Sequence, residues 1–215
     1  MQFKQSHLKK IIKGLYVITD TKIQNRYTHA ELAKLAISGG ANVIQYRSKN
    51  CEINTMIKEA IEVKIVCDLM KTPLIINDSI DVCLAVKADG VHLGASDIEV
   101  KKAREILGEN SIIGETIRNS EQAKQAILDG ADYLGLGPVN FTKTKDVNSD
   151  LVSIETINSV VQIATIPIIL ISGINIENAS RFLSTGVDGI AVVSAICTSN
   201  NVYETTKKFS ELFRI

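Results

Sequence analysis

The chain has 215 residues, 45% of them hydrophobic, which is enough for one full core, so a single domain is expected and two small domains are the weaker alternative. Its 24 basic and 24 acidic residues cancel, which argues against nucleic acid and an anionic membrane surface as partners. The apolar run after the basic start reaches Asp20 too soon for a secretory signal, and no membrane span is visible, so we expect a cytoplasmic protein.

The cysteines point to the same compartment. Cys51, Cys67, Cys83 and Cys197 are widely separated and form no C-x-x-C pair, which favours reduced thiols. Cys67 and Cys83 fall at apolar positions of expected helices, where packing is their expected role.

From residue 14 onward, short apolar runs alternate with longer amphipathic segments, which is the rhythm of βα units. Residues 1–13 are expected to be an N-terminal extension or helix. The expected strands are Gly14–Thr19, Ala41–Arg47, Pro73–Asn77, Gly90–Leu93, Ser111–Gly114, Tyr133–Gly137, Ile166–Ile171 and Gly189–Val193. The expected helices are His29–Ser38, Ile53–Met70, Ile80–Lys87, Ile98–Leu107, Ser120–Leu128, Leu151–Ile163, Ile176–Ser184 and Val202–Phe213. Eight of each is the count of a (β/α)8 TIM barrel, so residues 1–215 are expected to form one α/β domain of this type, with an open doubly wound sheet as the alternative.

Glycines stand between several helices and the strands that follow them. Gly39-Gly40, Gly90, Gly130 and Gly186 each come shortly after a helical segment, and we expect them to end these helices in the left-handed conformation. An acidic residue or an amide accompanies the glycine, and a buried strand follows. This recurring order indicates a repeated structural unit without an internal domain boundary.

The second expected strand carries polar side chains on one face. Because side chains alternate along a strand, Gln45, Arg47 and Lys49 share the face toward the barrel interior, while Ile44 and Tyr46 face the helices. Cations at the mouth of a barrel are costly without a partner, and a bound anion would offset this cost. The alternative is that both cations project into water or pair with neighbouring carboxylates.

Two carboxylates follow neighbouring strands. The third strand ends at Asn77-Asp78, and Asp97 lies on the loop after the fourth strand. In a barrel both loops lie at the carboxyl ends of the strands, where active sites of this fold are found. Hard oxygen ligands of this kind suit Mg²⁺. The structural alternative is helix capping, by one of residues 77–79 and by a capping box of Ser96 and Glu99 that leaves Asp97 in a first helical turn.

The remaining strand ends are rich in glycine and hydroxyl groups. Thr116 closes the fifth strand, residues 142–145 (Thr-Lys-Thr-Lys) follow the sixth, Ser172-Gly173 follow the seventh, and Val193-Ser194 end the eighth. Such residues bind phosphate, and the loops after strands seven and eight are a common phosphate site in this fold. The alternatives are a solvated lysine-rich turn at residues 142–145 and helix caps at the two serines.

No strong nucleophile or general base stands out. His7 and His29 lie outside the expected strand ends, and His92 sits within a strand, where a core histidine with satisfied hydrogen bonds is the expected role. The patterns G-x-S-x-G, H-E-x-x-H and dinucleotide-binding G-x-G-x-x-G do not occur in a supporting context.

Several segments carry a family resemblance, in the same order and over nearly the whole chain: LYVITD, VIQYRSK, LIINDSIDVCLAVKADGVHLGASD, GADYLGLGPVNFTKTK, IPIILISGIN and GIAVVSAI. They are similar to the thiamine phosphate synthase family. The resemblance implies a transferase that condenses 4-amino-5-hydroxymethyl-2-methylpyrimidine diphosphate with a thiazole phosphate, giving thiamine phosphate and pyrophosphate. It implies small-molecule substrates and Mg²⁺ as cofactor, and the sequence leaves open whether the protein is a homo-oligomer.

The resemblance also implies roles for individual residues. Gln45 would contact the pyrimidine, Asp78 and Asp97 the metal, and Thr116, where the family usually has serine, the region of the reacting centre. The diphosphate would be bound by Arg47, Lys49, Asn77 and Lys145. The thiazole phosphate would be bound by Thr142, Thr144, Gly173, Val193 and Ser194. The catalytic candidates are Arg47, Lys49, Thr116 and Lys145.

These residue types suit a dissociative substitution. Negative charge develops on the departing pyrophosphate, where cations and a metal stabilise it, while the aminopyrimidine disperses the positive charge on carbon. The attacking thiazole nitrogen then needs orientation and no general base.

Some positions depart from the family pattern. Ser48 replaces an acidic residue, Ile117-Arg118 replace a small residue and a histidine, Ser172 replaces glycine, and residues 146–150 lack a glycine. These changes bear on affinity and loop closure more than on the type of reaction. The sequence leaves two alternative functions open: an isomerase like the thiazole tautomerases of the same superfamily, and a non-catalytic barrel that binds phosphorylated ligands.

Overall fold

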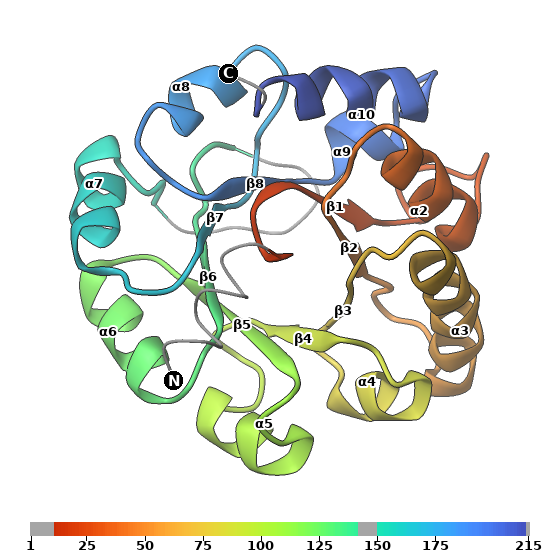
Figure 1. Cartoon of the computed structure of the whole chain (residues 1–215), viewed down its shortest axis with the longest axis horizontal. Coiled ribbons are helices and arrows are strands. Elements are labelled where there is room, and N and C mark those ends of the chain that lie inside the picture. Colours follow the sequence, from red (N-terminus) through yellow and green to blue (C-terminus); the bar gives the residue numbers. More distant parts are fainter. Residues whose placement is uncertain (1–10, 142–149, 214–215) are drawn as a thin grey trace.

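The computed structural model describes residues 11–141 and 150–213, and within these residues eight parallel strands form a closed barrel surrounded by helices (Figure 1). Each strand pairs with the next one in the chain, and the last strand pairs with the first. The predicted TIM barrel is confirmed. The open doubly wound sheet is excluded, because such a sheet would leave two edge strands unpaired. Among the helices of these residues, none combines the length and the apolar composition that a bilayer span requires.

The strands are β1 (Gly14–Thr19), β2 (Val43–Tyr46), β3 (Leu74–Asn77), β4 (Gly90–Leu93), β5 (Ile112–Ile117), β6 (Tyr133–Leu136), β7 (Ile168–Leu170) and β8 (Gly189–Val192). The helices are α2 (His29–Ser38), α3 (Ile53–Leu69), α4 (Ile80–Val86), α5 (Val100–Leu107), α6 (Ser120–Leu128), α7 (Ile154–Ile163), α8 (Ala179–Leu183), α9 (Ser194–Cys197) and α10 (Val202–Glu211). The short helix α9 was not predicted from the sequence.

One structural alternative and one local prediction do not hold. Helix α5 begins at Val100 after Glu99, whose side chain makes no cap hydrogen bond, so the capping box of Ser96 and Glu99 does not form. Asp97 therefore precedes the helix, and its Oδ2 accepts from the N–H of Gly94 at 2.7 Å. Gly90 does not end a helix either.

Lys87 ends α4, and Gly90 is required by close packing within β4. Lys87 adopts the left-handed conformation there, with φ of 53°. Gly90 lies in β4, where a Cβ atom would stand 2.0 Å from the carbonyl oxygen of Ile112. The predicted left-handed turns are found at Gly40, Gly130 and Gly186, which have φ of 102°, 93° and 87°.

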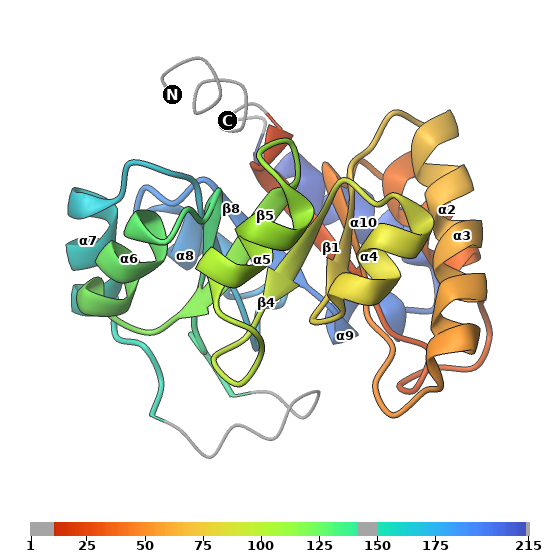
Figure 2. The same ribbon diagram turned by 90° about the horizontal axis from the view of Figure 1, so that it is seen from below.

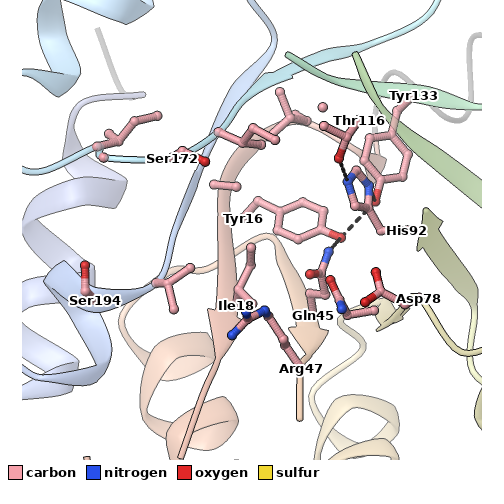
Figure 3. Close-up of a pocket in the computed structure, with 18 of the residues that line it drawn as sticks. Tyr16, Ile18, Gln45, Arg47, Asp78, His92, Thr116, Tyr133, Ser172 and Ser194 are labelled. Atoms are coloured by element: carbon pink, nitrogen blue, oxygen red, sulfur yellow. Dashed lines mark hydrogen bonds between the residues drawn. The ribbon is translucent and has the colours of Figure 1, made fainter. Parts of the chain in front are cut away.

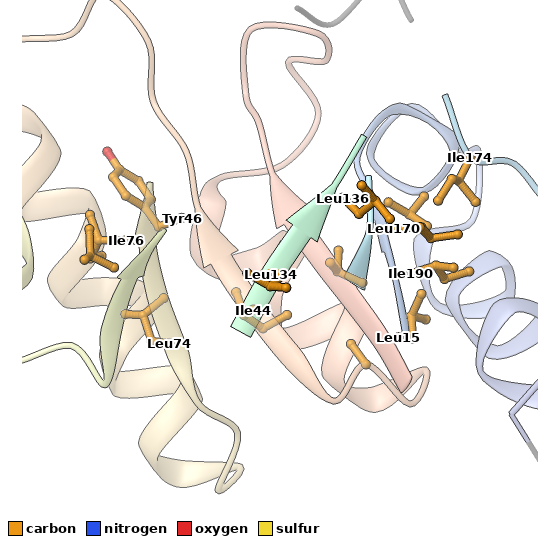
Figure 4. Packing of buried hydrophobic residues seen from close by; sticks show 14 of the residues in the cluster. Leu15, Ile44, Tyr46, Leu74, Ile76, Leu134, Leu136, Leu170, Ile174 and Ile190 are labelled. Atoms are coloured by element: carbon orange, nitrogen blue, oxygen red, sulfur yellow. The ribbon is translucent and has the colours of Figure 1, made fainter. Parts of the chain in front are cut away.

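Strand alternation divides the buried side chains into two layers. Ile44 and Tyr46 of β2 pack outward between the barrel and the helices, as predicted, together with residues such as Leu15, Leu74 and Leu134 (Figure 4). The inward layer fills the barrel with Ile12, Tyr16, Val43, Ile75, Ile112, Tyr133, Ile169 and Ala191. Ile12 lies ahead of β1, at the amino ends of the strands. That end is packed with apolar groups, which leaves the carboxyl ends for a polar site.

Polar side chains join the strands in pairs near their amino ends. Asn42 Oδ1 accepts from the N–H of Leu15 at 2.9 Å, and Asp89 Oδ2 accepts from the N–H of Leu74 at 2.8 Å. In the same way, Asp132 Oδ2 accepts from the N–H of Ile113 in β5, and Asp188 Oδ2 accepts from the N–H of Ile168 in β7, both at 2.9 Å. The acidic or amide residue of the repeated unit thus satisfies a backbone donor of the preceding strand.

Figure 2 shows the barrel from the side, with α9 at the lower edge and the start of the described chain at the upper edge. Because α9 directly follows β8, the lower edge in this view is the carboxyl end of the strands.

Asp132 offers a test of this polar pairing. Its side chain is 7% exposed, and its Oδ2 also lies 2.5 Å from the guanidinium of Arg104. Asp132→Ala removes these bonds and leaves the largely buried guanidinium of Arg104 without its carboxylate, so we expect the free energy of unfolding to fall by about 3–5 kcal/mol. Urea unfolding followed by circular dichroism measures the loss.

The matched control is Asp68→Ala. Asp68 pairs with Lys64 one turn earlier on α3, but its side chain is 62% exposed. An exposed pair of this kind contributes at most about 1 kcal/mol. Equal losses in the two variants would contradict the role given to Asp132.

Candidate active site

A pocket lies at the carboxyl ends of the strands (Figure 3) and encloses about 870 Å³, its open mouth included. Each of the eight strands, or the loop that follows it, contributes to its lining. The lining residues that the sequence identified are Gln45, Arg47, Lys49, Asn77, Asp78, Thr116, Gly173, Val193 and Ser194. Asp97 contacts Asp78. Thr142, Thr144 and Lys145 lie outside the described residues.

Both predicted cations line the pocket, and both are also paired with carboxylates. Arg47 contacts Asp20, which follows β1 and is buried. Lys49 contacts Asp78 across the mouth of the pocket. The pairing with neighbouring carboxylates is thus found, and it holds both cations beside the pocket. The bound anion stays a prediction.

The two predicted metal ligands lie side by side. Burial alone would raise the pKa of Asp78, but hydrogen bonds from Lys49 and Asp97 together hold it below its usual range. Burial raises the pKa of Asp97, and the neighbouring carboxylate of Asp78 raises it further, against the opposing effects of Gly94 and Lys49. Each carboxylate thus changes the pKa of the other, and a cation between them would ease the repulsion between their charges.

Neither of these acids caps a helix. Ser79 caps α4, with its hydroxyl accepting from the N–H of Val82 at 3.3 Å. Asp78 has a φ of 63°, and its N–H donates to the carbonyl of His92 at 2.9 Å. This left-handed backbone turns the Asp78 side chain toward the pocket that it lines.

The floor of the pocket is a row of hydrogen-bonded side chains (Figure 3). Gln45 Nε2 donates to the hydroxyl of Tyr16 at 2.9 Å, and this hydroxyl lies 2.9 Å from that of Tyr133. His92 follows, with Nδ1 at 2.9 Å from the Tyr133 hydroxyl and Nε2 at 2.9 Å from Thr116 Oγ1. His92 has the satisfied hydrogen bonds expected of a core histidine. It also lines the pocket, so the predicted role as a core histidine was correct but incomplete.

The loop after β7 forms the opposite side of the pocket. Ser172 and Gly173 both have left-handed backbones, with φ of 73° and 70°. Two amides support this turn, since Asn140 Nδ2 and Asn178 Nδ2 donate to the carbonyl of Gly173 at 3.3 and 3.0 Å. Neither Ser172 nor Ser194 provides a helix cap: Ser194 is the first residue of α9, and the residue before α8 is Asn178.

Sequence reasoning missed Tyr16, Tyr133 and Asp20. Each tyrosine stands next to a residue that faces the helices, such as Leu15 beside Tyr16 and Leu134 beside Tyr133. The period of two along β1 and β6 could therefore have placed both tyrosines inside the barrel. Asp20 had no such signal, because its role depends on the neighbouring strand that carries Arg47.

Comparison with known proteins identifies the family of this chain. The family model for thiamine monophosphate synthase matches residues 15–196. The chain is 40% identical to thiamine-phosphate synthase of Chloroflexus aurantiacus, over 94% of this chain and 93% of that protein. It is 42% identical to the same enzyme of Clostridium perfringens, over 93% and 96% of the two chains.

A solved structure, thiamine phosphate pyrophosphorylase from Pyrococcus furiosus, superposes with a TM-score of 0.86 and 35% identity, covering 97% of this chain and 98% of that one. Since the family model and these relatives span nearly the whole barrel, the chain belongs to the thiamine monophosphate synthase family.

Proposed function

We propose that residues 1–215 act as one barrel domain that condenses the pyrimidine diphosphate with thiazole phosphate and releases pyrophosphate. Membership of the family supports the reaction. The observation that carries the proposal for this chain is the clustering of Arg47, Lys49 and Asn77 with the Asp78 carboxylate in one pocket. The four cysteines are free, in keeping with a cytoplasmic enzyme.

Each side of the pocket has its own task in this proposal. Gln45 binds the pyrimidine at the floor, and Arg47, Lys49 and Asn77 bind the diphosphate at the mouth. Thr116 stands at the reacting centre between them. Gly173, Val193 and Ser194 bind the thiazole phosphate on the opposite side. Thr142, Thr144 and Lys145 complete the two phosphate sites, although they lie outside the described residues.

Asp78 and Asp97 would hold Mg²⁺. Two adjacent carboxylates are a donor set that suits a hard divalent ion, which commonly takes its other ligands from phosphate and water. When bound, Mg²⁺ would stabilise the negative charge that grows on the leaving pyrophosphate.

The side chains of this chain perform the rest of the reaction. The bond from the methylene carbon to the diphosphate oxygen breaks, and Arg47 and Lys49 stabilise the pyrophosphate as its charge grows. The pocket orients the thiazole nitrogen toward the methylene carbon, where the new bond forms. The nitrogen attacks through its lone pair, so no residue has to remove a proton from it.

The substrates themselves provide the decisive assay. We expect pyrophosphate release only when pyrimidine diphosphate, thiazole phosphate and Mg²⁺ are all present, measured by a coupled phosphate assay together with detection of thiamine phosphate. Conversion of thiazole phosphate alone would instead identify a tautomerase. Tight binding without turnover of either substrate would identify a non-catalytic barrel.

The metal ligands can be tested separately. Asp78→Asn keeps the shape of the side chain but removes its charge, and we expect the rate to fall by about 10²–10³-fold, with a higher Mg²⁺ concentration needed for half-maximal rate. Rates measured over a series of Mg²⁺ concentrations report both effects. Asp81→Asn, an exposed acid in the first turn of α4, is the control and should keep the normal dependence. A normal Mg²⁺ dependence in Asp78→Asn would remove this residue from the metal site.

Lys49, which lies beside the two proposed metal ligands, gives a further prediction. Because its attraction to pyrophosphate grows as the bond breaks, Lys49→Met should lower kcat by about 10²-fold and change KM much less. Steady-state kinetics separate the two constants. Lys58→Met, on an exposed position of α3, removes the same charge away from the pocket and should leave both constants unchanged. An increase in KM with normal kcat would show that Lys49 only binds substrate.

A further inference from the structure

The row of hydrogen bonds on the pocket floor connects two residues with different proposed tasks, Gln45 and Thr116. Gln45, Tyr16 and Tyr133 are each at most 2% exposed, so their polar groups depend on one another for partners. The Gln45 side chain lines the pocket, and its Nε2 donates to Tyr16. Among the described residues, none donates a hydrogen bond to its Oε1. The amide oxygen is therefore left for a ligand.

The barrel is built to accommodate the rings of this row. A Cβ atom on Gly114 would stand 2.1 Å from Cζ of Tyr133, and one on Gly135 would stand 2.8 Å from Cε1 of His92. The two rings lie against each other with centroids 5.4 Å apart. Both glycines occupy strand positions where a larger residue would displace a member of the row.

The number of protons in the row limits which group donates and which accepts in each hydrogen bond. Burial raises the pKa of Tyr16 and of Tyr133 far above the usual range, so each hydroxyl keeps its single proton. Gln45 Nε2 donates to the Tyr16 oxygen, whereas the contacts of Tyr16 with Tyr133, of Tyr133 with His92 and of His92 with Thr116 fit either donor. Starting from Gln45, we infer one direction, in which Tyr16 donates to Tyr133, Tyr133 donates to Nδ1 of His92, and Nε2 of His92 donates to Thr116. The Thr116 proton is left to point into the pocket.

We propose that Tyr16, Tyr133 and His92 are positioning residues that fix which way the Gln45 amide faces, and thereby select an aminopyrimidine over its 4-oxo analogue. This inference rests on the proposed function, because it assigns the pyrimidine to Gln45. An amide pairs with the amino group and the neighbouring ring nitrogen of an aminopyrimidine, as asparagine or glutamine pairs with adenine. The 4-oxo analogue presents an acceptor and a ring N–H, which is the reverse order.

Removing the middle of the row should release this constraint. In Tyr133→Phe the Tyr16 proton loses its acceptor, and it can bond the Gln45 oxygen once the amide has rotated. The rotated amide presents its NH₂ group to the ligand, which suits the oxo compound. The variant therefore changes selectivity without deleting the residue proposed to contact the pyrimidine.

Binding of two unreactive ligands tests the inference. The dissociation constants of the 4-amino and 4-oxo hydroxymethylpyrimidine monophosphates are measured by calorimetry for the wild type and the variants. We expect the preference for the amino compound to fall at least about tenfold in Tyr133→Phe, which corresponds to one misdirected hydrogen bond at a buried site. Tyr16→Phe is the second variant, with the same expectation, if Tyr133→Phe does not fold.

Tyr46→Phe is the matched control. It removes another buried tyrosine hydroxyl, which donates to Glu59 Oε2 at 2.6 Å on the outer side of the barrel. Its selectivity should equal that of the wild type. An unchanged preference in Tyr133→Phe, or an equal fall in Tyr46→Phe, would overturn the inference.

The tautomer of His92 gives a test that needs no substrate. Nitrogen-15 NMR of the wild-type protein, with His92 assigned from a His92→Gln sample, should show a neutral ring protonated on Nε2. A charged ring, or one protonated on Nδ1, would overturn the direction of the row. If thiamine phosphate is not formed by the wild type, the proposed function fails, whereas a normal reaction with unchanged selectivity in Tyr133→Phe removes this inference alone.

Discussion

The carboxylate of Asp78 lies between the ammonium of Lys49 and a second carboxylate, Asp97, and the candidate active site depends on this arrangement of charge. Two carboxylates so close cannot both ionise freely at the mouth of a barrel, so the site favours a cation between them and a cation beside them. Asp20 and Asp78 already balance the two basic side chains, so a metal ion would leave the mouth with a net positive charge that a diphosphate would offset. The mouth of this pocket is therefore suited to an anionic ligand with a metal.

The closed sheet makes this arrangement possible. Lys49, Asp78 and Asp97 follow β2, β3 and β4, which are neighbours in the barrel, so their loops lie together although they are far apart in the sequence. The amino ends of the strands are held by buried apolar side chains and by bonds such as that of Asp132 to Ile113. The barrel thus has a packed end that provides stability and an open end that carries chemistry.

Within the pocket, the mouth and the floor differ in character. Ion pairs dominate the mouth, where charge develops during the proposed reaction. Neutral hydrogen bonds dominate the floor, where Tyr16 and Tyr133 stay protonated because they are buried. Neutral groups orient a ring without attracting the diphosphate. Separate regions for orientation and for charge stabilisation let the two requirements be met without conflict.

Much of this protein was determined by its sequence alone. The periods of strands and helices predicted the barrel, and alternation along β2 placed Gln45 inside and Ile44 outside, because side-chain direction on a strand is a local property. The family resemblance predicted the site residues, and many of them line one pocket. Only the tertiary structure decided that Asp20 pairs with Arg47, that Asp97 lies beside Asp78 ahead of its helix, and that His92 joins Thr116 to the tyrosines. These partners come from different strands, and their distances depend on how the barrel closes, which local patterns in the sequence do not encode.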